Sequence, residues 1–356
     1  PGPSGHFRRW RRIVLALLFL SSLSAAATPK RVLILNPFAR DVEPFTAAVS
    51  AFRSTLAREL GEPLDFHEIP LELARFTGPE GEGPLVTFLE ERIKNRPVDL
   101  VVSIGGAGAQ FADRHRERLF PATPVLMVAS SPRMVPVGLQ GANATLVTQE
   151  IDLPSMVEDI LQLQPKTRHI AVVFGASPLE SFWVGECRRE FEAFAERVEF
   201  IWLNDLPLNE VVERCANLPP DSFILHGLFV VDAAGIPSEK NEALRRLHQS
   251  ANAPLFGYFE SEFGLGPIGG HLFQNSRVGA EGARTALRIL RGERAGSIPF
   301  LVLEPTAPVY DWRELRRWGI REAGLPAGSS IEFREPTFWE RYRWQVVGAT
   351  LFGVLQ

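Results

Sequence analysis

The stretch that decides the fold is VDLVVSIGGAGAQFADRHRERLFPATPVLMVASS, from Val98 to Ser131. It contains an apolar run at 100–104 that ends in two glycines, a helical segment at 109–119 and a second apolar run at 125–129. Neither run alternates apolar with polar residues, which is typical of strands buried on both faces of a parallel sheet. The stretch therefore predicts a strand, a glycine turn, a helix and a second, parallel strand.

The same alternation extends on both sides of this stretch. Before it, the sequence predicts strands at 31–36 and 64–71 and helices at 44–60 and 84–94. After an irregular segment, 132–151, the pattern starts again. This second series has helices over 153–163, 179–195, 208–216, 240–250 and 276–291, and strands over 169–174, 198–203, 222–228, 254–258 and 301–303.

Two such series predict two doubly wound, Rossmann-like α/β lobes joined by a hinge. The sequence places lobe 1 at 29–135 and lobe 2, with the hinge crossings, at 136–320. Two lobes joined in this way can close around a ligand. The composition agrees with a globular chain, since 45% of the residues are hydrophobic and 22% are charged. The net charge of −4 gives no indication of a nucleic-acid surface.

The first 28 residues have the form of a secretory signal. Four arginines between Arg8 and Arg12 precede a short apolar run, 13–20, and a small-residue region that ends in Ala25-Ala26-Ala27. An uncleaved membrane anchor is the alternative, although the apolar core is shorter than the roughly 20 residues that a spanning helix needs. Residues 1–28 are therefore predicted to be a signal peptide or anchor that directs the lobes out of the cytoplasm.

The C-terminal end of the sequence resembles a segment that leads into a membrane. A linker at 321–338 leads to an aromatic and Arg-rich segment, Phe338–Trp344, and then to the apolar residues 346–355. Aromatic residues directly before an apolar run are typical of a membrane interface. We expect residues 339–356 to be the start of a transmembrane helix; a short buried terminal helix is the alternative.

Taken in order, these elements resemble a known family. The turns at Asn36-Pro37, 103–106, 129–131 and Phe174-Gly175 in an exported two-lobe chain are similar to those of ABC-transporter substrate-binding proteins with the type I periplasmic-binding fold. The ending, DWRELRRWGI followed by LPAGSSIEFREPTFWERYRW, looks like that of membrane-anchored members. In those proteins the binding region is the extracytoplasmic sensor of a two-component histidine kinase. The resemblance implies a sensor in the cell inner membrane, with the binding region in the periplasm.

Candidate ligand-binding residues follow from the position of the strand ends. In open α/β sheets, ligands bind beyond the carboxyl ends of the parallel strands. The residues that occupy those ends are Asn36, Phe38, Gly105, Gly106, Ser130, Ser131, Phe174, Ser177, His226, Phe229 and Tyr258. The aromatic residues among them suit a small organic solute better than a bare ion.

Several of these candidates also have structural interpretations. The Gly105–Gly108 run departs from the dinucleotide motif G-x-G-x-x-G and lacks an acidic residue about 20 positions later, so a backbone cradle for a ligand or a purely structural tight turn is favoured over a nucleotide site. Ser130 and Ser131 are candidates for binding a ligand or for capping the next turn. His226 is a candidate ligand contact or a satisfied core histidine.

The sequence predicts no cofactor, metal site or enzymatic activity. Cys187, Cys215 and the histidines show no metal-ligand spacing. The expected partners are a small organic solute, amino-acid-like or otherwise amphipathic, the membrane, and the protein's own cytoplasmic kinase domains; a homodimer is possible and nucleic acid is not expected. The alternatives are the substrate-binding component of an ABC transporter, which would deliver its solute to a permease, and an α/β enzyme.

Overall fold

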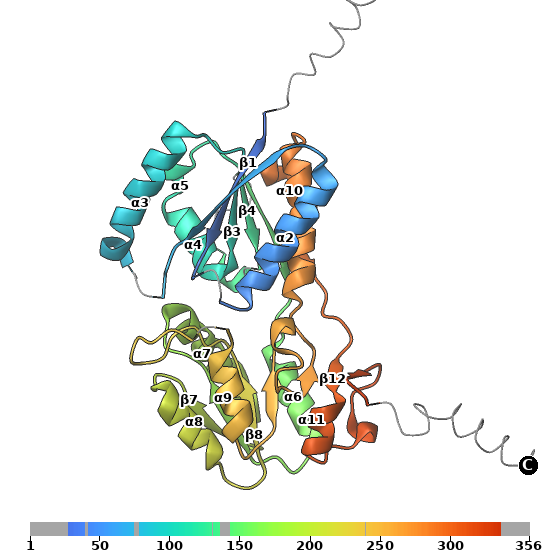
Figure 1. Cartoon of the computed structure of the whole chain (residues 1–356). Helices are drawn as coiled ribbons and strands as arrows, with labels where there is room; N and C mark the ends of the chain where they lie inside the picture. Colours follow the sequence, from blue (N-terminus) through green and yellow to red (C-terminus); the bar gives the residue numbers. More distant parts are fainter. Residues whose placement is uncertain are drawn as a thin grey trace, which may run out of the picture.

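The chain folds into two α/β lobes, one above the other in Figure 1. The computed structural model describes residues 28–39, 42–74, 78–129, 131–135, 143–238 and 240–335. Nearly all of the predicted signal and all of the predicted transmembrane segment lie outside these ranges. Among the described residues, no helix has both the length and the apolar character needed to cross a bilayer.

Lobe 1 is built on a parallel sheet, to which the described residues contribute six strands in the order β11-β5-β4-β3-β1-β2. They are β1 (Lys30–Asn36), β2 (Leu64–Pro70), β3 (Leu100–Ile104), β4 (Val125–Val128), β5 (Ala144–Gln149) and β11 (Leu301–Leu303). Every residue of β3, β4 and β5 is buried. The continuous apolar runs of the opening stretch are thus the centre of a sheet that is covered on both faces, as the sequence predicts.

Helices cover both faces of this sheet (Figure 1). They are α2 (Phe45–Leu60), α3 (Gly78–Asn95), α4 (Gly105–Arg114), α5 (Arg116–Leu119) and α10 (Asn275–Leu290). In Figure 1, α2 and α10 lie side by side although about 200 residues separate them in the sequence. Gly279 permits this contact, because a Cβ at that position would overlap the carbonyl oxygen of Ala48.

Lobe 2 has a parallel sheet with four strands among the described residues, in the order β7-β6-β8-β9. The strands are β6 (His169–Val173), β7 (Glu199–Leu203), β8 (Ser222–His226) and β9 (Leu255–Gly257), and the helices are α6 (Leu153–Leu163), α7 (Pro178–Phe191), α8 (Leu208–Ala216) and α9 (Glu242–Ser250). A smaller sheet of β10 (Gly269–Gly270), β12 (Val309–Asp311) and β13 (Ser330–Glu332) lies beside it with α11 (Trp312–Arg317).

Three segments of the described chain cross between the lobes: 150–152, 271–274 and 304–308. Hydrogen bonds join them to one another. The Gln149 side chain donates from Nε2 to the Leu272 carbonyl (3.1 Å) and accepts from the Gln274 N–H (3.0 Å). The Glu150 N–H donates to the Leu303 carbonyl (3.0 Å). The crossings therefore form one connected hinge.

The sequence-based boundary between the lobes, placed between residues 135 and 136, differs from the division that the structure shows. Strand β5 lies inside the segment 132–151, which the sequence presents as irregular, and β5, α10 and β11 all belong to lobe 1. The polar residues of β5 hide it from a hydrophobic pattern, but they are satisfied in the core: the Thr145 hydroxyl, for example, donates to the Ile298 carbonyl at 3.0 Å. Lobe 2 is therefore smaller than predicted.

Candidate functional site

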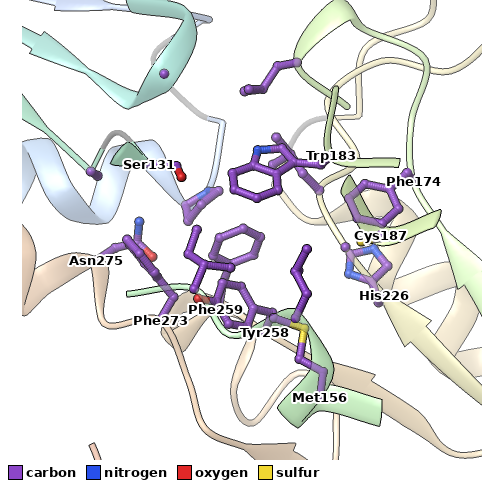
Figure 2. Close-up of a pocket in the computed structure, with 18 of the residues that line it drawn as sticks. Ser131, Met156, Phe174, Trp183, Cys187, His226, Tyr258, Phe259, Phe273 and Asn275 are labelled. Carbon is purple, nitrogen blue, oxygen red and sulfur yellow. The ribbon is translucent and has the colours of Figure 1, made fainter. Parts of the chain in front are cut away.

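A cavity lies between the two lobes at the carboxyl ends of their strands (Figure 2). Its volume is about 780 Å³, which includes the part open to solvent. Lobe 1 contributes residues near the ends of β3 and β4 and the starts of α2 and α10, including Gly106, Ser131 and Asn275. Lobe 2 contributes the ends of β6 and β8 and one side of α7. The cavity is therefore where ligands bind in open α/β folds.

The walls are largely aromatic. Trp183 projects from α7 of lobe 2, and Phe174 follows β6 in the same lobe. Tyr258, Phe259 and Phe273 contact one another, with ring centroids 5.3 to 6.4 Å apart. Such a cluster holds its rings in fixed positions, because edge-to-face contacts favour particular orientations. The cavity is thus a preformed slot between aromatic faces.

A few buried polar atoms interrupt this apolar lining. His226, Tyr258 and Asn275 are buried, with exposed fractions of 3%, 9% and 2%. Three of their polar atoms, His226 Nε2, Tyr258 Oη and Asn275 Oδ1, have no hydrogen-bond partner among the described residues. His226 Nδ1 lies 3.2 Å from Glu262 Oε1, although outside hydrogen-bond geometry. Burial raises the pKa of Tyr258 well above its usual value, so the hydroxyl keeps its proton. Each unpaired atom carries a cost of about 1–3 kcal/mol that a bound molecule can remove.

A second opening of the same cleft adjoins the cavity. It has a volume of about 1030 Å³, and Met134 and Leu179 line both spaces. Ser177 lies here at the start of α7, where its hydroxyl accepts from the Glu180 N–H (3.4 Å) and the Glu180 carboxylate accepts from the Ser177 N–H (2.6 Å). This capping box fixes the helix that carries Trp183.

Glu180 is an unusual feature of this helix start, because its carboxylate is fully buried. Besides the Ser177 N–H, it accepts the backbone N–H of Val230, which joins α7 to the loop after β8. Burial raises the pKa of Glu180 from near 4.5 to about 7, against the opposing effect of these hydrogen bonds. The group thus orders the cavity wall from behind, without lining the cavity itself.

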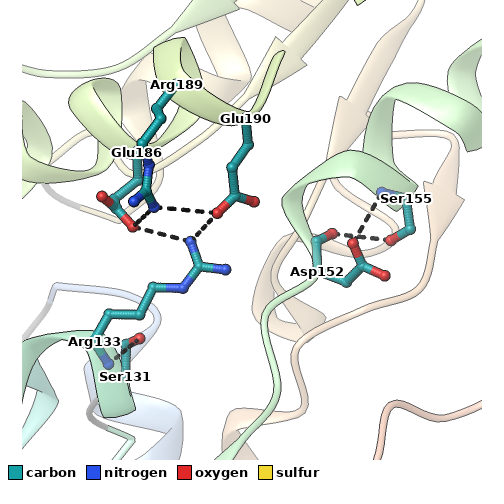
Figure 3. Close-up of polar contacts among 7 residues, drawn as sticks. All are labelled: Ser131, Arg133, Asp152, Ser155, Glu186, Arg189 and Glu190. Carbon is teal, nitrogen blue, oxygen red and sulfur yellow. Dashed lines mark hydrogen bonds and ion pairs between the residues drawn. The ribbon is translucent and has the colours of Figure 1, made fainter. Parts of the chain in front are cut away.

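Ion pairs across the cleft connect the lobes at one edge (Figure 3). Arg133, in the short turn after β4, reaches Glu186 and Glu190 on α7 at 3.0 and 2.5 Å. Its N–H donates to the Ser131 hydroxyl (3.2 Å), so the arginine is attached directly to a residue of the cavity. Glu186 and Glu190 thus balance the positive charge of Arg133, and none of the three residues lines the cavity.

The structure brings many of the sequence-predicted residues together. Gly106, Ser131, Phe174, His226 and Tyr258 line the cavity, and Phe38 and Ser177 line the adjoining opening. Their role as ligand contacts stays a prediction. Ser131 also caps the turn that contains Arg133, and Gly106 packs closely on Met134, since a Cβ there would lie 2.8 Å from Met134 Cε.

Three candidates line neither space, and a fourth, Ser130, lies outside the described residues. Asn36 is buried, with Nδ2 3.4 Å from Glu68 Oε1 and Oδ1 accepting from the Phe38 N–H. Gly105 has a φ of 64° and faces the Phe45 ring, which is a structural turn. Phe229 packs in the apolar core of lobe 2. The role of these residues as ligand contacts also stays a prediction.

Sequence reasoning missed Trp183, Met156, Phe273 and Asn275 as cavity residues. Trp183 and Met156 lie within helices, and Phe273 and Asn275 belong to the second hinge crossing and the helix after it. No strand-end rule identifies them, because their approach to the cavity depends on how the lobes pack. In the described part of the chain, no group of three or more His, Cys, Asp or Glu side chains is arranged to hold a metal ion.

Comparison with known proteins shows which solved structures have a similar fold. No protein-family model matches the chain, and no curated protein matches it by sequence. Among solved structures, it is similar to a conserved domain protein from Vibrio cholerae, with a TM-score of 0.65 and 18% identity over 85% of this chain and 100% of the other. It is also similar to an ABC domain from Streptococcus pneumoniae in complex with L-Trp (TM-score 0.62, 16% identity, 85% and 100% covered).

A further similar structure is an ABC transporter solute-binding protein from Bacillus halodurans with bound myo-inositol (TM-score 0.53, 12% identity, 81% and 96% covered). At these identities the likeness shows the fold. Together with the parallel sheets, the hinge crossings and the cavity between the lobes, it leads to one conclusion: the described chain has the two-lobe α/β fold of the ABC-transporter solute-binding proteins, the type I periplasmic-binding fold.

Proposed function

We propose that the two lobes bind a small organic solute outside the cytoplasm, in the cavity between them. The observation that carries this proposal is the cavity itself, which both lobes line and in which buried polar atoms have no partner among the described residues. Two similar structures contain such a solute: the ABC domain from S. pneumoniae is in complex with L-Trp, and the ABC transporter solute-binding protein from B. halodurans has bound myo-inositol.

Binding would work by closing the cleft. A solute that contacts Trp183 of lobe 2 and Asn275 of lobe 1 at once gains more contacts when the lobes are close than when they are apart. The hydrogen-bonded hinge allows this motion without breaking either sheet. The result is a ligand-dependent change in the relative position of two rigid lobes.

We further propose that this change is sensed by a membrane protein of which these lobes are the sensor. The support comes from the sequence: Phe338–Trp344 precedes the apolar residues 346–355, as in membrane-anchored members of this fold family. The hinge movement would bias the segment that follows β13 and, through it, cytoplasmic kinase domains, in a single chain or in a homodimer. This region has no catalytic role in the proposal.

The substrate-binding component of an ABC transporter is the second candidate, favoured by the names of the similar solved structures. The reading frame beyond Gln356 separates the two. A completed apolar span followed by a dimerisation helix and ATP-binding motifs supports the sensor. A stop codon at that point supports the transporter component.

Thermal denaturation tests solute binding itself. The protein is heated with a panel of L-amino acids, sugars and small neutral aromatic compounds. A ligand at 100 times its dissociation constant stabilises the folded state by about 2.7 kcal/mol and so raises the Tm. At least one compound should raise the Tm of wild type and of the control Trp312→Ala. The same compound should raise the Tm of Trp183→Ala far less, because Trp183 lines the cavity and Trp312 does not. A panel without any such compound would count against solute binding.

A further inference from the structure

The lining of the cavity limits the charge that its ligand can carry. Among the described residues that line it, none is Asp, Glu, Lys or Arg. Of the charged groups nearby, Arg133 pairs with two glutamates, and Glu260 accepts from the Ser276 hydroxyl and N–H. Glu43 Oε2 and Glu262 Oε2 have no hydrogen-bond partner among the described residues, but neither residue lines the cavity. An ammonium or carboxylate brought into such a site loses its hydration without gaining a partner, at a cost of several kcal/mol per ion. The cavity thus disfavours zwitterions such as amino acids.

The lining also limits the number of hydroxyl groups on the ligand. A sugar presents polar groups around its whole ring, and each one requires a partner when it is buried. The cavity offers Asn275, His226, Tyr258 and Ser131 among walls that are otherwise aromatic and aliphatic. Flat apolar rings fit these walls better, since Trp183 and the Tyr258–Phe259–Phe273 cluster present ring faces and edges to the space.

The unpaired polar atoms indicate which polar group the ligand brings. Asn275 Oδ1 can only accept a hydrogen bond. His226 Nδ1 lies 3.2 Å from Glu262 Oε1, and in the tautomer with the proton on Nδ1 the Nε2 atom can accept a hydrogen bond. Figure 2 shows Asn275 and His226 on opposite sides of the view, with the aromatic rings between them. Asn275 Oδ1, and His226 Nε2 in this tautomer, call for a ligand with an O–H or N–H group, while the unpaired Tyr258 hydroxyl can itself donate to an acceptor atom of the ligand.

We infer that the ligand is an uncharged aromatic molecule that carries an O–H or N–H donor, of the phenol or indole type. The inference rests on the proposed solute-binding function and specifies its substrate class. The aromatic ring lies between Trp183 and the Tyr258–Phe259–Phe273 cluster. The donor reaches Asn275 Oδ1 or His226 Nε2 and removes the cost of burying that acceptor unpaired.

Calorimetric titration of the full chain tests the ligand class with matched probes. Indole and phenol should bind. L-Tryptophan has the indole ring and adds a zwitterion, so it should bind at least 10-fold more weakly than indole. 1-Methylindole lacks the N–H donor and should also bind about 10-fold more weakly. At least one of the two variants Asn275→Leu and His226→Leu should show a smaller preference for indole over 1-methylindole. The control Asn209→Leu, on the exposed side of α8, should retain the wild-type preference.

The outcomes separate this inference from the function on which it rests. Tighter binding of an amino acid or a sugar than of indole and phenol overturns the ligand class and leaves solute binding standing. Equal affinities for indole and 1-methylindole in wild type overturn the donor requirement. Failure of indole and phenol while another member of the thermal panel binds at Trp183 also overturns the ligand class. Only the absence of any ligand in that panel contradicts solute binding as such.

Discussion

Arg133 Nη1 lies 3.0 Å from Glu186 Oε2, so that a residue of lobe 1 is paired with a helix of lobe 2 directly beside the cavity. Glu190 accepts from the same nitrogen, and Arg189 lies 2.7 Å from Glu186 on the other side. Figure 3 shows the four side chains as one group. The Arg133 side chain is 33% exposed and those of Glu186 and Glu190 are 17% and 19% exposed, so water screens the group only in part. This network holds the lobes together at the edge of the cleft.

Removing the pairing should favour the open form. Arg133→Gln should increase the radius of gyration in small-angle scattering and weaken the binding of a cavity ligand by about 5-fold, since partly exposed pairs of this kind are worth about 1 kcal/mol. Salt should weaken binding in wild type and have less effect in the variant. Arg118→Gln removes an ion pair with Glu90 inside lobe 1 and should change neither property. Identical salt dependence in wild type and Arg133→Gln would show that the network does not contribute to closure.

Glu180 should make stability decrease as pH rises. The folded state holds its proton up to about pH 7, whereas the unfolded chain releases it near pH 4.5. Between these values the folded state binds more protons, so the free energy of unfolding falls with rising pH, by roughly 3 kcal/mol in total. Glu180→Gln removes this dependence.

Urea denaturation of both proteins from pH 4.5 to pH 8 measures the difference. The stability of wild type relative to Glu180→Gln should decline across this window and level off above pH 7. A constant difference would mean that the carboxyl group is ionised throughout in the folded state.

The close approach at Gly227 should be sensitive to a single methyl group. A Cβ at this position would overlap the Phe174 ring, and both residues line the cavity. Gly227→Ala should lower stability by about 1–3 kcal/mol, as overpacking does, and should weaken ligand binding by displacing the ring. Gly185 offers a matched control, because it lies within α7 with no atom within 4 Å of its Cβ position. Gly185→Ala should raise stability by up to about 1 kcal/mol; equal effects of the two changes, measured by chemical denaturation, would contradict the packing argument.

The two thiols should differ only in their response to a ligand. Burial raises the pKa of Cys187 and of Cys215 to about 12, so both should react very slowly with iodoacetamide at pH 8 and quickly in urea. Cys187 lines the cavity and Cys215 does not. Indole at saturating concentration should therefore slow the residual labelling of Cys187 alone, as followed by peptide mass spectrometry. Equal protection of both thiols would indicate a global change instead of occupation of the cavity.

The sequence by itself determined the fold class and the strand ends. The runs 100–104 and 125–129 are apolar on both faces, and only a sheet covered by helices on both sides buries them fully. The same local logic located Gly106, Ser131, Phe174, His226 and Tyr258 near the cavity, because the end of a strand can be identified from the residues next to it.

Only the tertiary structure decided which lobe each later segment belongs to and what the ligand meets. Helix α10 and strand β11 lie in lobe 1 because they pack on α2 and pair with β5, which are distant from them in the sequence. Trp183, Phe273 and Asn275 likewise reach the cavity through the packing of segments that are far apart in the chain. Hydrophobic periodicity shows that a helix has a buried face but not which surface buries it. That choice depends on contacts between segments far apart in the chain, which no local pattern encodes.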